Sequence, residues 1–311
     1  MKKENAIMIR VLASDGMNKA AAADLRAKGY EVVEQFYEPE DLKRELANYD
    51  VLVVRSATKV REPIIDAAVE AGRLKLVIRG GVGVDNIDVK YAESKGLKVT
   101  NTPKASSDSV AELALGHMLA MARYISIANV TMREGKWEKK KYEGVELAGK
   151  TLGLIGMGRI SQSIARKATA LGMKVMYTDI FEIKGLPEEY VCATQEEVLK
   201  NADFVSLHIP AAKDGKPVIT AEHLAMMKPT AFIVNTARGG LIDEDALVDA
   251  LEQDKLAGAA LDVFAKEPLQ NERIMNCPKI SLTPHIGGST KEAQGRIGQE
   301  IVEIIENFFN K

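Results

Sequence analysis

Two polar side chains suited to binding and protonating an organic acid follow predicted strands. Arg238 comes after the apolar run AFIVNTA, and His285 comes after ISLTP and precedes two glycines. A guanidinium can hold a carboxylate through two hydrogen bonds, and an imidazole titrates near neutral pH. His208, at the end of FVSLH, has an equivalent position. The pattern predicts a site that binds a carboxylate and transfers a proton, and spacing alone leaves His208 and His285 as alternatives for the acid–base.

A glycine-rich turn provides a second constellation. The predicted strand TLGLIG runs into Gly156-Met157-Gly158 and then into the helical segment QSIARKATALG. Gly156 permits the tight turn, and Gly158 lets a pyrophosphate approach the amides at the helix N-terminus. Asp179 ends the next strand, where a carboxylate accepts hydrogen bonds from ribose hydroxyls and repels a 2′-phosphate. The turn therefore predicts dinucleotide binding, with NAD favoured over NADP.

Ser161 departs from this motif, because the third small residue is usually glycine or alanine and serves close packing of helix on strand. We expect slight local widening at Ser161. Its hydroxyl is expected to bond the carbonyl one helical turn back and not to contact the cofactor.

The elements that must position these residues follow an alternating pattern of β-branched runs and amphipathic segments. A first set of expected strands spans residues 7–13, 31–36, 51–55, 74–79 and 97–101. A second set spans residues 151–156, 174–179, 204–208, 231–237, 258–264 and 280–284. We expect an α/β protein with two Rossmann-like, doubly wound parallel-sheet domains and a cleft between them.

Two helical segments are expected to connect the two sets of strands. Ser109 and Glu112 fit a capping box at the start of an apolar helix that would cross from one domain to the other. Residues 290–309 form a helical pattern with no strand after it, so they should dock on the first domain. His117, within the apolar helix, is expected to be a packing or surface residue.

The composition is typical of a soluble globular protein of two domains. The 311 residues are 46% hydrophobic and 28% charged, with a formal charge of −2. The charges form no basic stripe for nucleic acid, and no uncharged apolar segment reaches the roughly 18 residues of a membrane span. We expect a cytoplasmic protein with no nucleic-acid or membrane partner and no metal site. Cys192 and Cys277 are expected to be small buried residues.

Three motifs resemble the active-site segments of the D-isomer-specific 2-hydroxyacid dehydrogenases, and the resemblance extends over nearly the whole chain. They are NTARGGLIDEDAL, ALDVFAKEP and PHIGGST. The resemblance implies that Arg238, Glu267 and His285 are catalytic, and it moves His208 to the cofactor neighbourhood. His285 would exchange a proton with the substrate oxygen, Glu267 would orient the imidazole, and Arg238 would bind the substrate carboxylate. Glu267 alone would be taken for a solvated charge.

The same resemblance implies a discontinuous substrate-binding domain, residues 1–104 plus 286–311, and an NAD-binding Rossmann domain, residues 105–285. It also implies that Asp262 contacts the nicotinamide carboxamide. The residues assigned to NAD are Gly156, Gly158, Arg159, Ile160, Asp179, His208, Pro210, Thr236, Ala237, Asp262, Gly287 and Gly288.

Within the family, VRSATKV, RGGVGVDNIDV and GKWEKKKYEGVELAGKTLG are most similar to segments of the 3-phosphoglycerate dehydrogenases. The activity implied is NAD-dependent oxidation of 3-phospho-D-glycerate to 3-phosphooxypyruvate. Backbone amides around Gly81 can form a nest for the carboxylate, and two arginines at strand ends can bind the phosphate. The residues assigned to substrate are Arg55, Ser56, Arg79, Gly81, Val82, Gly83 and Asn86.

Two other functions are compatible with the same residues. The nearer is a hydroxypyruvate or glyoxylate reductase, which would use the same three catalytic residues and depend less on Arg55 and Arg79. The more remote is an NAD-sensing, corepressor-like binding protein, since the fold does not determine the function. By analogy, the apolar helix and the segment around Trp137 favour a homodimer.

Overall fold

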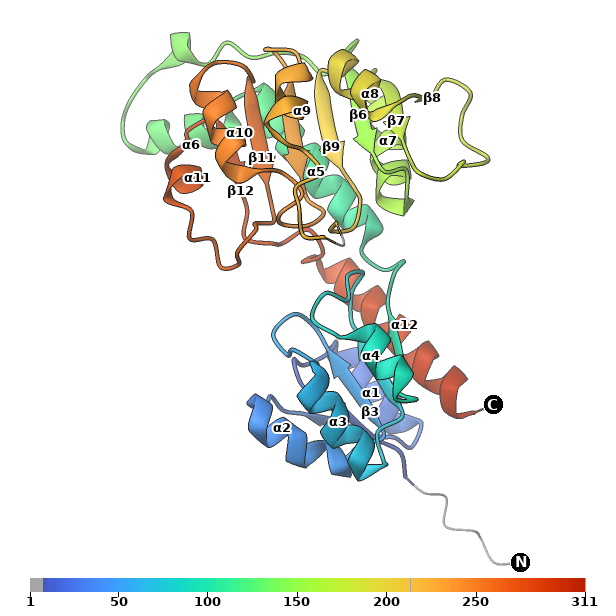
Figure 1. Cartoon of the computed structure of the whole chain (residues 1–311). Coiled ribbons are helices and arrows are strands. Elements are labelled where there is room, and N and C mark those ends of the chain that lie inside the picture. The colour runs from blue at the N-terminus through green and yellow to red at the C-terminus, as the bar shows by residue number, and fades with distance from the viewer. Residues whose placement is uncertain (1–7, 213, 311) are drawn as a thin grey trace, which may run out of the picture. The chain divides into compact units, whose positions relative to one another are not determined.

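The computed structural model describes residues 8–212 and 214–310. The chain forms two compact units, Met1–Ser106 with Gly288–Lys311, and Ser107–Gly287. Their boundaries follow residues 106 and 287, where the sequence suggested 104 and 285. Both units are α/β, with helices on a parallel sheet (Figure 1), and the expected fold class is confirmed.

The first unit contains a five-stranded parallel sheet in the order β2-β1-β3-β4-β5. Its strands are β1 (Arg10–Ala13), β2 (Glu31–Glu34), β3 (Val51–Val54), β4 (Leu76–Arg79) and β5 (Lys98–Asn101). The helices are α1 (Lys19–Ala27), α2 (Pro39–Glu45), α3 (Glu62–Ala71), α4 (Val89–Ser94) and α12 (Lys291–Phe309), with a 3₁₀ turn at Leu46–Asn48. All four residues of β3 are buried, because helices cover both faces of the sheet. The order of the strands reverses between β1 and β3, the point where such sheets bind ligands.

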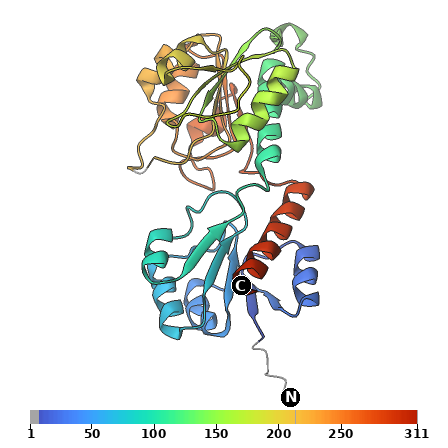
Figure 2. The same ribbon diagram turned by 90° about the vertical axis from the view of Figure 1, so that its right-hand side faces the viewer.

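The C-terminal helix α12 packs beside α1 in this first unit (Figure 2), although the two are far apart in the sequence. A Cβ added at Gly298 would lie 2.7 Å from the Cβ atoms of Asn18 and Ala21, so the helices approach closely there. Ile301 and Ile305 of α12 join the core of the sheet. The apolar stripe of α12 therefore closes one face of the first unit.

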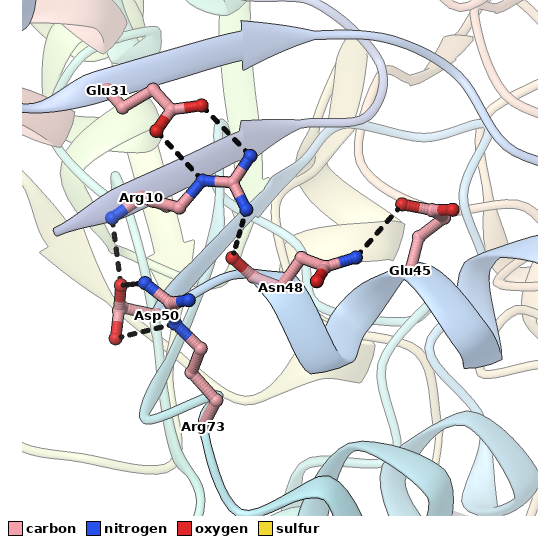
Figure 3. A network of polar contacts seen from close by, with 6 residues as sticks. All are labelled: Arg10, Glu31, Glu45, Asn48, Asp50 and Arg73. Carbon is pink, nitrogen blue, oxygen red and sulfur yellow. Dashed lines mark hydrogen bonds and ion pairs between the residues drawn. The ribbon is translucent and has the colours of Figure 1, made fainter.

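Charged side chains surround Asp50 at the amino-terminal edge of the same sheet (Figure 3). Its Oδ2 accepts hydrogen bonds from the backbone nitrogen of Arg10 at 2.8 Å and from Nη2 of Arg73 at 3.0 Å. The guanidinium of Arg10 forms an ion pair with Glu31 at 2.9 Å and donates to the carbonyl of Asn48 at 3.0 Å. Asp50 thus keeps its charge paired although its side chain is only 10% exposed.

The second unit contains a seven-stranded parallel sheet in the order β12-β11-β10-β9-β6-β7-β8. Its strands are β6 (Thr151–Ile155), β7 (Lys174–Thr178), β8 (Val191–Cys192), β9 (Phe204–Leu207), β10 (Phe232–Asn235), β11 (Gly258–Leu261) and β12 (Ile280–Leu282). The helices are α5 (Ser107–Ala122), α6 (Ile125–Arg133), α7 (Arg159–Ala170), α8 (Gln195–Asn201), α9 (Ala221–Met226), α10 (Glu244–Glu252) and α11 (Glu272–Asn276), with a 3₁₀ turn at Lys139–Lys141. The strand order reverses between β6 and β9, whose carboxyl ends therefore flank the expected ligand crevice.

Three expectations about local structure are wrong. Helix α5 begins at Ser107, so Ser109 lies inside its first turn and is not the N-cap. The helix lies entirely in the second unit and does not cross between the units. Cys192 is exposed on the short edge strand β8, and Cys277 is half-buried, because neither lies on a central strand.

The apolar character of α5 reflects burial in the core of the second unit, where Ala111, Ala114 and Met118 pack against the sheet. Among the described residues, no helix is by itself both long and apolar enough to cross a bilayer. Helices α5 and α6 meet that criterion only when joined, and they are bent by 62°.

Candidate active site

The turn between β6 and α7 depends on its first glycine. Gly156 has φ +88°, and a Cβ there would lie 2.8 Å from the carbonyl oxygen of His208 and 2.7 Å from Cγ2 of Ile209. A larger residue would therefore collide with the end of β9. A Cβ on Gly158, in contrast, would meet no atom within 4 Å, so the space beside the N-terminus of α7 is open.

Asp179 supports this turn from the end of β7. Its Oδ2 accepts a hydrogen bond from the backbone nitrogen of Met157 at 2.7 Å, and its Oδ1 accepts one from Phe181 at 3.0 Å. The carboxylate is half-buried beside the turn. Each carboxylate oxygen can accept further bonds, so these contacts orient Asp179 and leave it able to accept from ribose hydroxyls.

Ser161 is completely buried, and its hydroxyl donates to the carbonyl of Gly156 at 2.6 Å. The acceptor lies five residues back, before the helix begins, and not one helical turn back as expected. The hydroxyl therefore ties the first turn of α7 to the glycine turn. This bond gives the serine a local structural role in the motif.

Two buried polar atoms at the neighbouring strand ends have no hydrogen-bond partner among the described residues. They are Nδ1 of His208, after β9, and Oγ1 of Thr236, after β10. The other ring nitrogen of His208 lies 3.0 Å from Oγ of Ser206. Burial lowers the pKa of His208 to about 4, so its imidazole is neutral at pH 7. A buried neutral histidine is better suited to lining a ligand-binding site than to acting as a general acid–base.

These features together fit a dinucleotide. An open helix N-terminus next to Gly158 can receive the pyrophosphate, and Asp179 lies at the adjoining strand end. The orphaned atoms of His208 and Thr236 line the same carboxyl edge and require a partner that the protein does not supply. Arg159 and Ile160 open α7, and Pro210 and Ala237 follow the neighbouring strands.

The acid–base pair lies at the far side of this edge. Nδ1 of His285 is 2.7 Å from Oε2 of Glu267, and the two side chains are 46% and 37% exposed. Oε1 of Glu267 accepts from the backbone nitrogen of Phe264 at 3.1 Å, which fixes the carboxylate toward the ring. A carboxylate on one ring nitrogen fixes the orientation of the imidazole. The pair is accessible to a small molecule.

Asp262 holds the loop that carries His285. It is completely buried, with Oδ1 accepting from Ile286 N at 2.8 Å and Oδ2 accepting from Gly287 N at 2.8 Å. The backbone nitrogen of His285 donates to the carbonyl of Asp262 at 2.8 Å. In this conformation the carboxylate is engaged with the loop, and the suggested contact with the nicotinamide carboxamide stays a prediction.

Arg238 lies in a turn fixed by a residue that the sequence did not single out, Asn235. Its Nδ2 donates to the carbonyl of Arg238 at 2.8 Å, and its Oδ1 accepts from Ala237 N at 3.1 Å. A Cβ on Gly239 would lie 1.7 Å from the carbonyl oxygen of Phe264, so this turn presses against the loop that leads to Glu267. The Arg238 turn and the Glu267 loop are thus joined within one unit.

The residues assigned to substrate lie at the ends of β3 and β4 in the first unit. The guanidinium of Arg79 covers Gly81, because a Cβ on that glycine would lie 1.4 Å from Nη1. Gly81 has φ +147°, and Asn101 Nδ2 donates to the carbonyl of Val82. Arg79 therefore lies directly over the turn proposed as a carboxylate nest. Gly83 continues this half-buried turn.

Arg55 has different surroundings. It lines an open depression of about 400 Å³ with Asn18, Ser289, Thr290, Lys291 and Gln294. Its backbone nitrogen donates to Asp15 Oδ2 at 2.7 Å, and Ser56 follows on the exposed loop. Asn86 Nδ2 donates to the carbonyls of Arg55 and Thr58, both at 2.8 Å, so its amide nitrogen ties the two loops together.

The structure brings together some of the predicted residues and leaves others apart. Glu267 contacts His285, and the Arg238 turn contacts the loop before Glu267. His208 lies across the sheet beside the glycine turn. Arg55 and Arg79 lie at the ends of two paired strands, β3 and β4, but their side chains have different surroundings. Arg79 covers Gly81, and Arg55 lines the depression next to α12. One signal in the sequence could have identified the supporting residues Asn235 and Asp15, because each is a polar side chain at or just beyond the end of a buried strand.

Comparisons with known proteins agree with this geometry. The NAD-binding domain of the D-isomer specific 2-hydroxyacid dehydrogenases matches residues 115–287. A hydroxypyruvate reductase of Thermotoga maritima is 48% identical over 302 residues, covering 95% of this chain and 97% of that protein. The chain belongs to the D-isomer specific 2-hydroxyacid dehydrogenase family. It is accordingly an NAD-dependent oxidoreductase that acts on CH–OH groups.

Other members of the family differ from this chain in length and from one another in activity. A D-3-phosphoglycerate dehydrogenase of Methanocaldococcus jannaschii is 43% identical over 302 residues, covering 96% of this chain but only 57% of that protein. The crystal structure of a glyoxylate reductase from Paecilomyes thermophila superposes with a TM-score of 0.85 at 29% identity, covering 96% and 95% of the two chains. The family is thereby established, and the substrate within it stays open.

Proposed function

We propose that this dehydrogenase reduces hydroxypyruvate or glyoxylate to the corresponding 2-hydroxy acid, with His285 as the general acid. The contact of 2.7 Å between His285 and Glu267 carries the proposal, because it fixes the orientation of an imidazole that can transfer a proton. Bound NADH supplies the hydride for C2. The imidazolium of His285 donates its proton to the carbonyl oxygen, and Arg238 binds the substrate carboxylate.

The choice of an unphosphorylated substrate rests on the similarity to the Thermotoga maritima hydroxypyruvate reductase. That relative matches this chain over nearly the full length of both proteins at 48% identity. The phosphoglycerate dehydrogenase from Methanocaldococcus jannaschii is less similar, at 43%, and the chain spans 57% of its length. The comparison therefore favours the reductase over the phosphoglycerate dehydrogenase that the sequence motifs suggested.

Oxidation of 3-phospho-D-glycerate is the second candidate. The depression beside Arg55 favours it, because Lys291 and the N-terminus of the 19-residue helix α12 lie in the same lining. A guanidinium, an ammonium and a helix N-terminus all attract a phosphate. Arg79, over the Gly81 turn, would then bind the carboxylate end.

The two candidate functions are tested by comparing their two keto-acid substrates in the reduction reaction. We expect kcat/KM with NADH to be at least about tenfold higher for hydroxypyruvate than for 3-phosphooxypyruvate, a difference of about 1.4 kcal/mol. Arg55→Gln should change the value for hydroxypyruvate by less than about threefold. A parent enzyme that prefers the phosphorylated acid, with Arg55→Gln losing that preference alone, would establish the second candidate instead.

NAD is assigned to the second unit, Ser107–Gly287, and the substrate to Arg238 of that unit and to the turns of the first unit. For the cofactor, the amides beside Gly158 would meet the pyrophosphate, and Asp179 would accept from the ribose. Gly287 packs against Asp262, and Gly288 lies near Ser106, so both shape the loop after His285. For the substrate, Arg79, Gly81, Val82 and Gly83 would surround the carboxylate. The negative charge of Asp179 favours NAD over NADP.

We further propose that the enzyme is a homodimer. Several apolar side chains between α5 and the segment after α6 are exposed: Tyr124, Ile125, Val130, Met132 and Trp137. Trp137 is 79% exposed. A run of this kind is typical of a surface that another chain covers. Sedimentation equilibrium should give twice the chain mass, and Trp137→Glu with Ile125→Glu should give the monomer.

A further inference from the structure

His117, a histidine on α5, is connected by side-chain hydrogen bonds to the loop that carries His285. It is 4% exposed. Its Nε2 lies 2.9 Å from Oγ1 of Thr283, and its Nδ1 lies 3.1 Å from Oγ of Ser281. Thr283 Oγ1 in turn lies 2.6 Å from Oδ1 of Asp262. All of these residues belong to the second unit.

The chemistry of the groups determines the direction of each bond. A carboxylate only accepts, so the single hydroxyl proton of Thr283 points to Asp262. His117 must then donate from Nε2 to the oxygen of Thr283. Burial lowers the pKa of His117, and its neutral ring leaves Nδ1 as an acceptor for the hydroxyl of Ser281. The chain of bonds therefore runs one way, from Ser281 through His117 and Thr283 to Asp262.

Asp262 connects this chain of hydrogen bonds to the loop that carries His285. Its two oxygens accept from the backbone nitrogens of Ile286 and Gly287, each at 2.8 Å. Gly287 also packs on α5, since a Cβ there would lie 3.3 Å from Cγ2 of Val110. The loop from His285 to Gly287 therefore lies close against α5. Its position depends on how the carboxylate of Asp262 is held.

His285 needs such support. Its φ is +53°, a left-handed conformation that is uncommon for residues with a side chain. Its side chain is 46% exposed, so packing alone does not fix the ring. The backbone bonds of the loop and the contact with Glu267 set where the imidazole points. A rotation of the loop by a small angle would move the ring nitrogens away from a bound substrate.

We propose that His117 and Thr283 are positioning residues, which act through Asp262 to hold His285 in its productive orientation. The inference rests on the proposed role of His285 as the general acid. The side chains of His117 and Thr283 form hydrogen bonds with Ser281, with each other and with Asp262, so their contribution to His285 is geometric. The imidazole of His117 selects the rotamer of Thr283, and Thr283 in turn fixes the carboxylate.

The test compares Thr283→Val with Thr283→Ser in the full-length enzyme. Valine has nearly the shape of threonine but no hydroxyl, and serine keeps the hydroxyl. His117→Leu removes the donor to Thr283. Thr169→Val is the matched control, because Thr169 on α7 also loses a hydroxyl contact, of 3.4 Å with Tyr190, at the opposite end of the sheet. For each variant, kcat, both KM values, the pH–rate profile and Tm are measured.

We expect Thr283→Val to lower kcat by about 10- to 100-fold, as small misplacements of reacting groups do. KM for NADH should change by less than about threefold, and the pH–rate profile should differ from that of the parent as Glu267 and His285 lose alignment. Thr283→Ser should recover kcat to within about threefold of the parent. His117→Leu combined with Thr283→Val should be no worse than Thr283→Val alone, because both act through one bond.

Several results would overturn the inference. They are a Thr283→Val enzyme with the parent's kcat and pH profile, a Thr283→Ser enzyme as impaired as Thr283→Val, or additive losses in the double variant. If Thr283→Val does not fold, His117→Leu and Thr283→Ser decide the question by the same readouts. Turnover in His285→Ala would refute the proposed general acid itself. An inactive His285→Ala enzyme beside a normal Thr283→Val enzyme would refute the positioning role alone.

Discussion

Two aspartates, one in each unit, are almost completely buried beside a parallel strand, but their partners differ. Asp50 precedes β3 and pairs with the guanidinium of Arg73 at 3.0 Å (Figure 3). Asp262 follows β11, and it accepts hydrogen bonds from neutral donors, two backbone amides and the hydroxyl of Thr283. The first lies at the amino edge of its sheet and the second at the carboxyl edge.

The comparison shows how position in a doubly wound sheet determines the use of a buried charge. At the amino edge, where such folds rarely bind ligands, the charge of Asp50 is met by a cation and serves stability. At the carboxyl edge, Asp262 uses its acceptor capacity to order the loop that presents His285. The same side chain is structural in one place and organises an active site in the other.

The largest expected effect concerns the group that the Asp262 loop presents. His285→Ala should lower kcat by about 10²–10⁴-fold, the usual contribution of a positioned acid–base, while the Kd for NADH stays within about threefold. Glu267→Gln should lower kcat as well, since the ring of His285 loses the carboxylate that orients it. Steady-state kinetics and fluorescence titration with NADH measure these values. An active His285→Ala enzyme with His208→Ala inactive would identify His208 as the acid–base instead.

The second prediction separates the two aspartates. Asp50→Asn should lower the free energy of unfolding by about 3 kcal/mol, because Arg73 and the backbone nitrogen of Arg10 lose a charged acceptor that is almost completely buried, and should leave kcat within about twofold. Asp262→Asn should show the opposite balance, with a loss of kcat that exceeds the loss of stability. Urea unfolding and steady-state kinetics on the same preparations provide the two readouts. Equal effects on both quantities in the two variants would remove the distinction between the edges.

Much of the fold could be predicted because parallel strands are buried on both faces and read as continuous β-branched runs. All eleven expected strands are present among the described residues. The strand β8, Val191–Cys192, was missed because it is two residues long and exposed at the sheet edge. The start of α5 was misplaced because Ser106, Ser107, Asp108 and Ser109 are all good capping residues, and sequence alone does not rank them.

The site was predictable only where chemistry coincides with a strand end. Arg238 and His285 are of that kind. Glu267 was found by resemblance alone, because an exposed glutamate before a proline looks like any solvated charge. The connection from His117 to Thr283 spans 166 residues, so it arises from packing of α5 on β12 and leaves no local pattern. Positioning residues of this kind become visible only when the fold is known.

A third, smaller effect concerns His208, the buried histidine at the carboxyl edge. Burial lowers its pKa from 6.5 to about 4, so the unfolded chain binds a proton between these values that the folded chain does not. Stability should therefore fall as the pH drops from 7 to 5, by about 2 kcal/mol from this residue. Urea unfolding of the apoenzyme at both pH values measures the loss. His208→Gln should reduce the loss by that amount, and an unchanged difference between the two pH values would mean that His208 is not buried in solution.

The smallest expected effect concerns Asp179, the carboxylate at the carboxyl edge that is still available to a ligand. In the structure its Oδ2 accepts from Met157 N at 2.7 Å, so removing the side chain would also disturb the glycine turn. Asp179→Asn disturbs the turn less, because the amide oxygen can accept the Met157 bond while the negative charge is lost, and only the bond from Phe181 N loses its acceptor. Without the charge, repulsion of a 2′-phosphate disappears and one ribose hydrogen bond weakens. The ratio of kcat/KM for NADPH to that for NADH should rise by about tenfold, which corresponds to about 1.4 kcal/mol, the size of one such hydrogen bond.

Asp179→Ala should lower activity with both cofactors, since the Met157 amide then has no acceptor. A parent enzyme that already uses NADPH as well as NADH, or an Asp179→Asn enzyme with an unchanged ratio, would show that the cofactor is selected elsewhere.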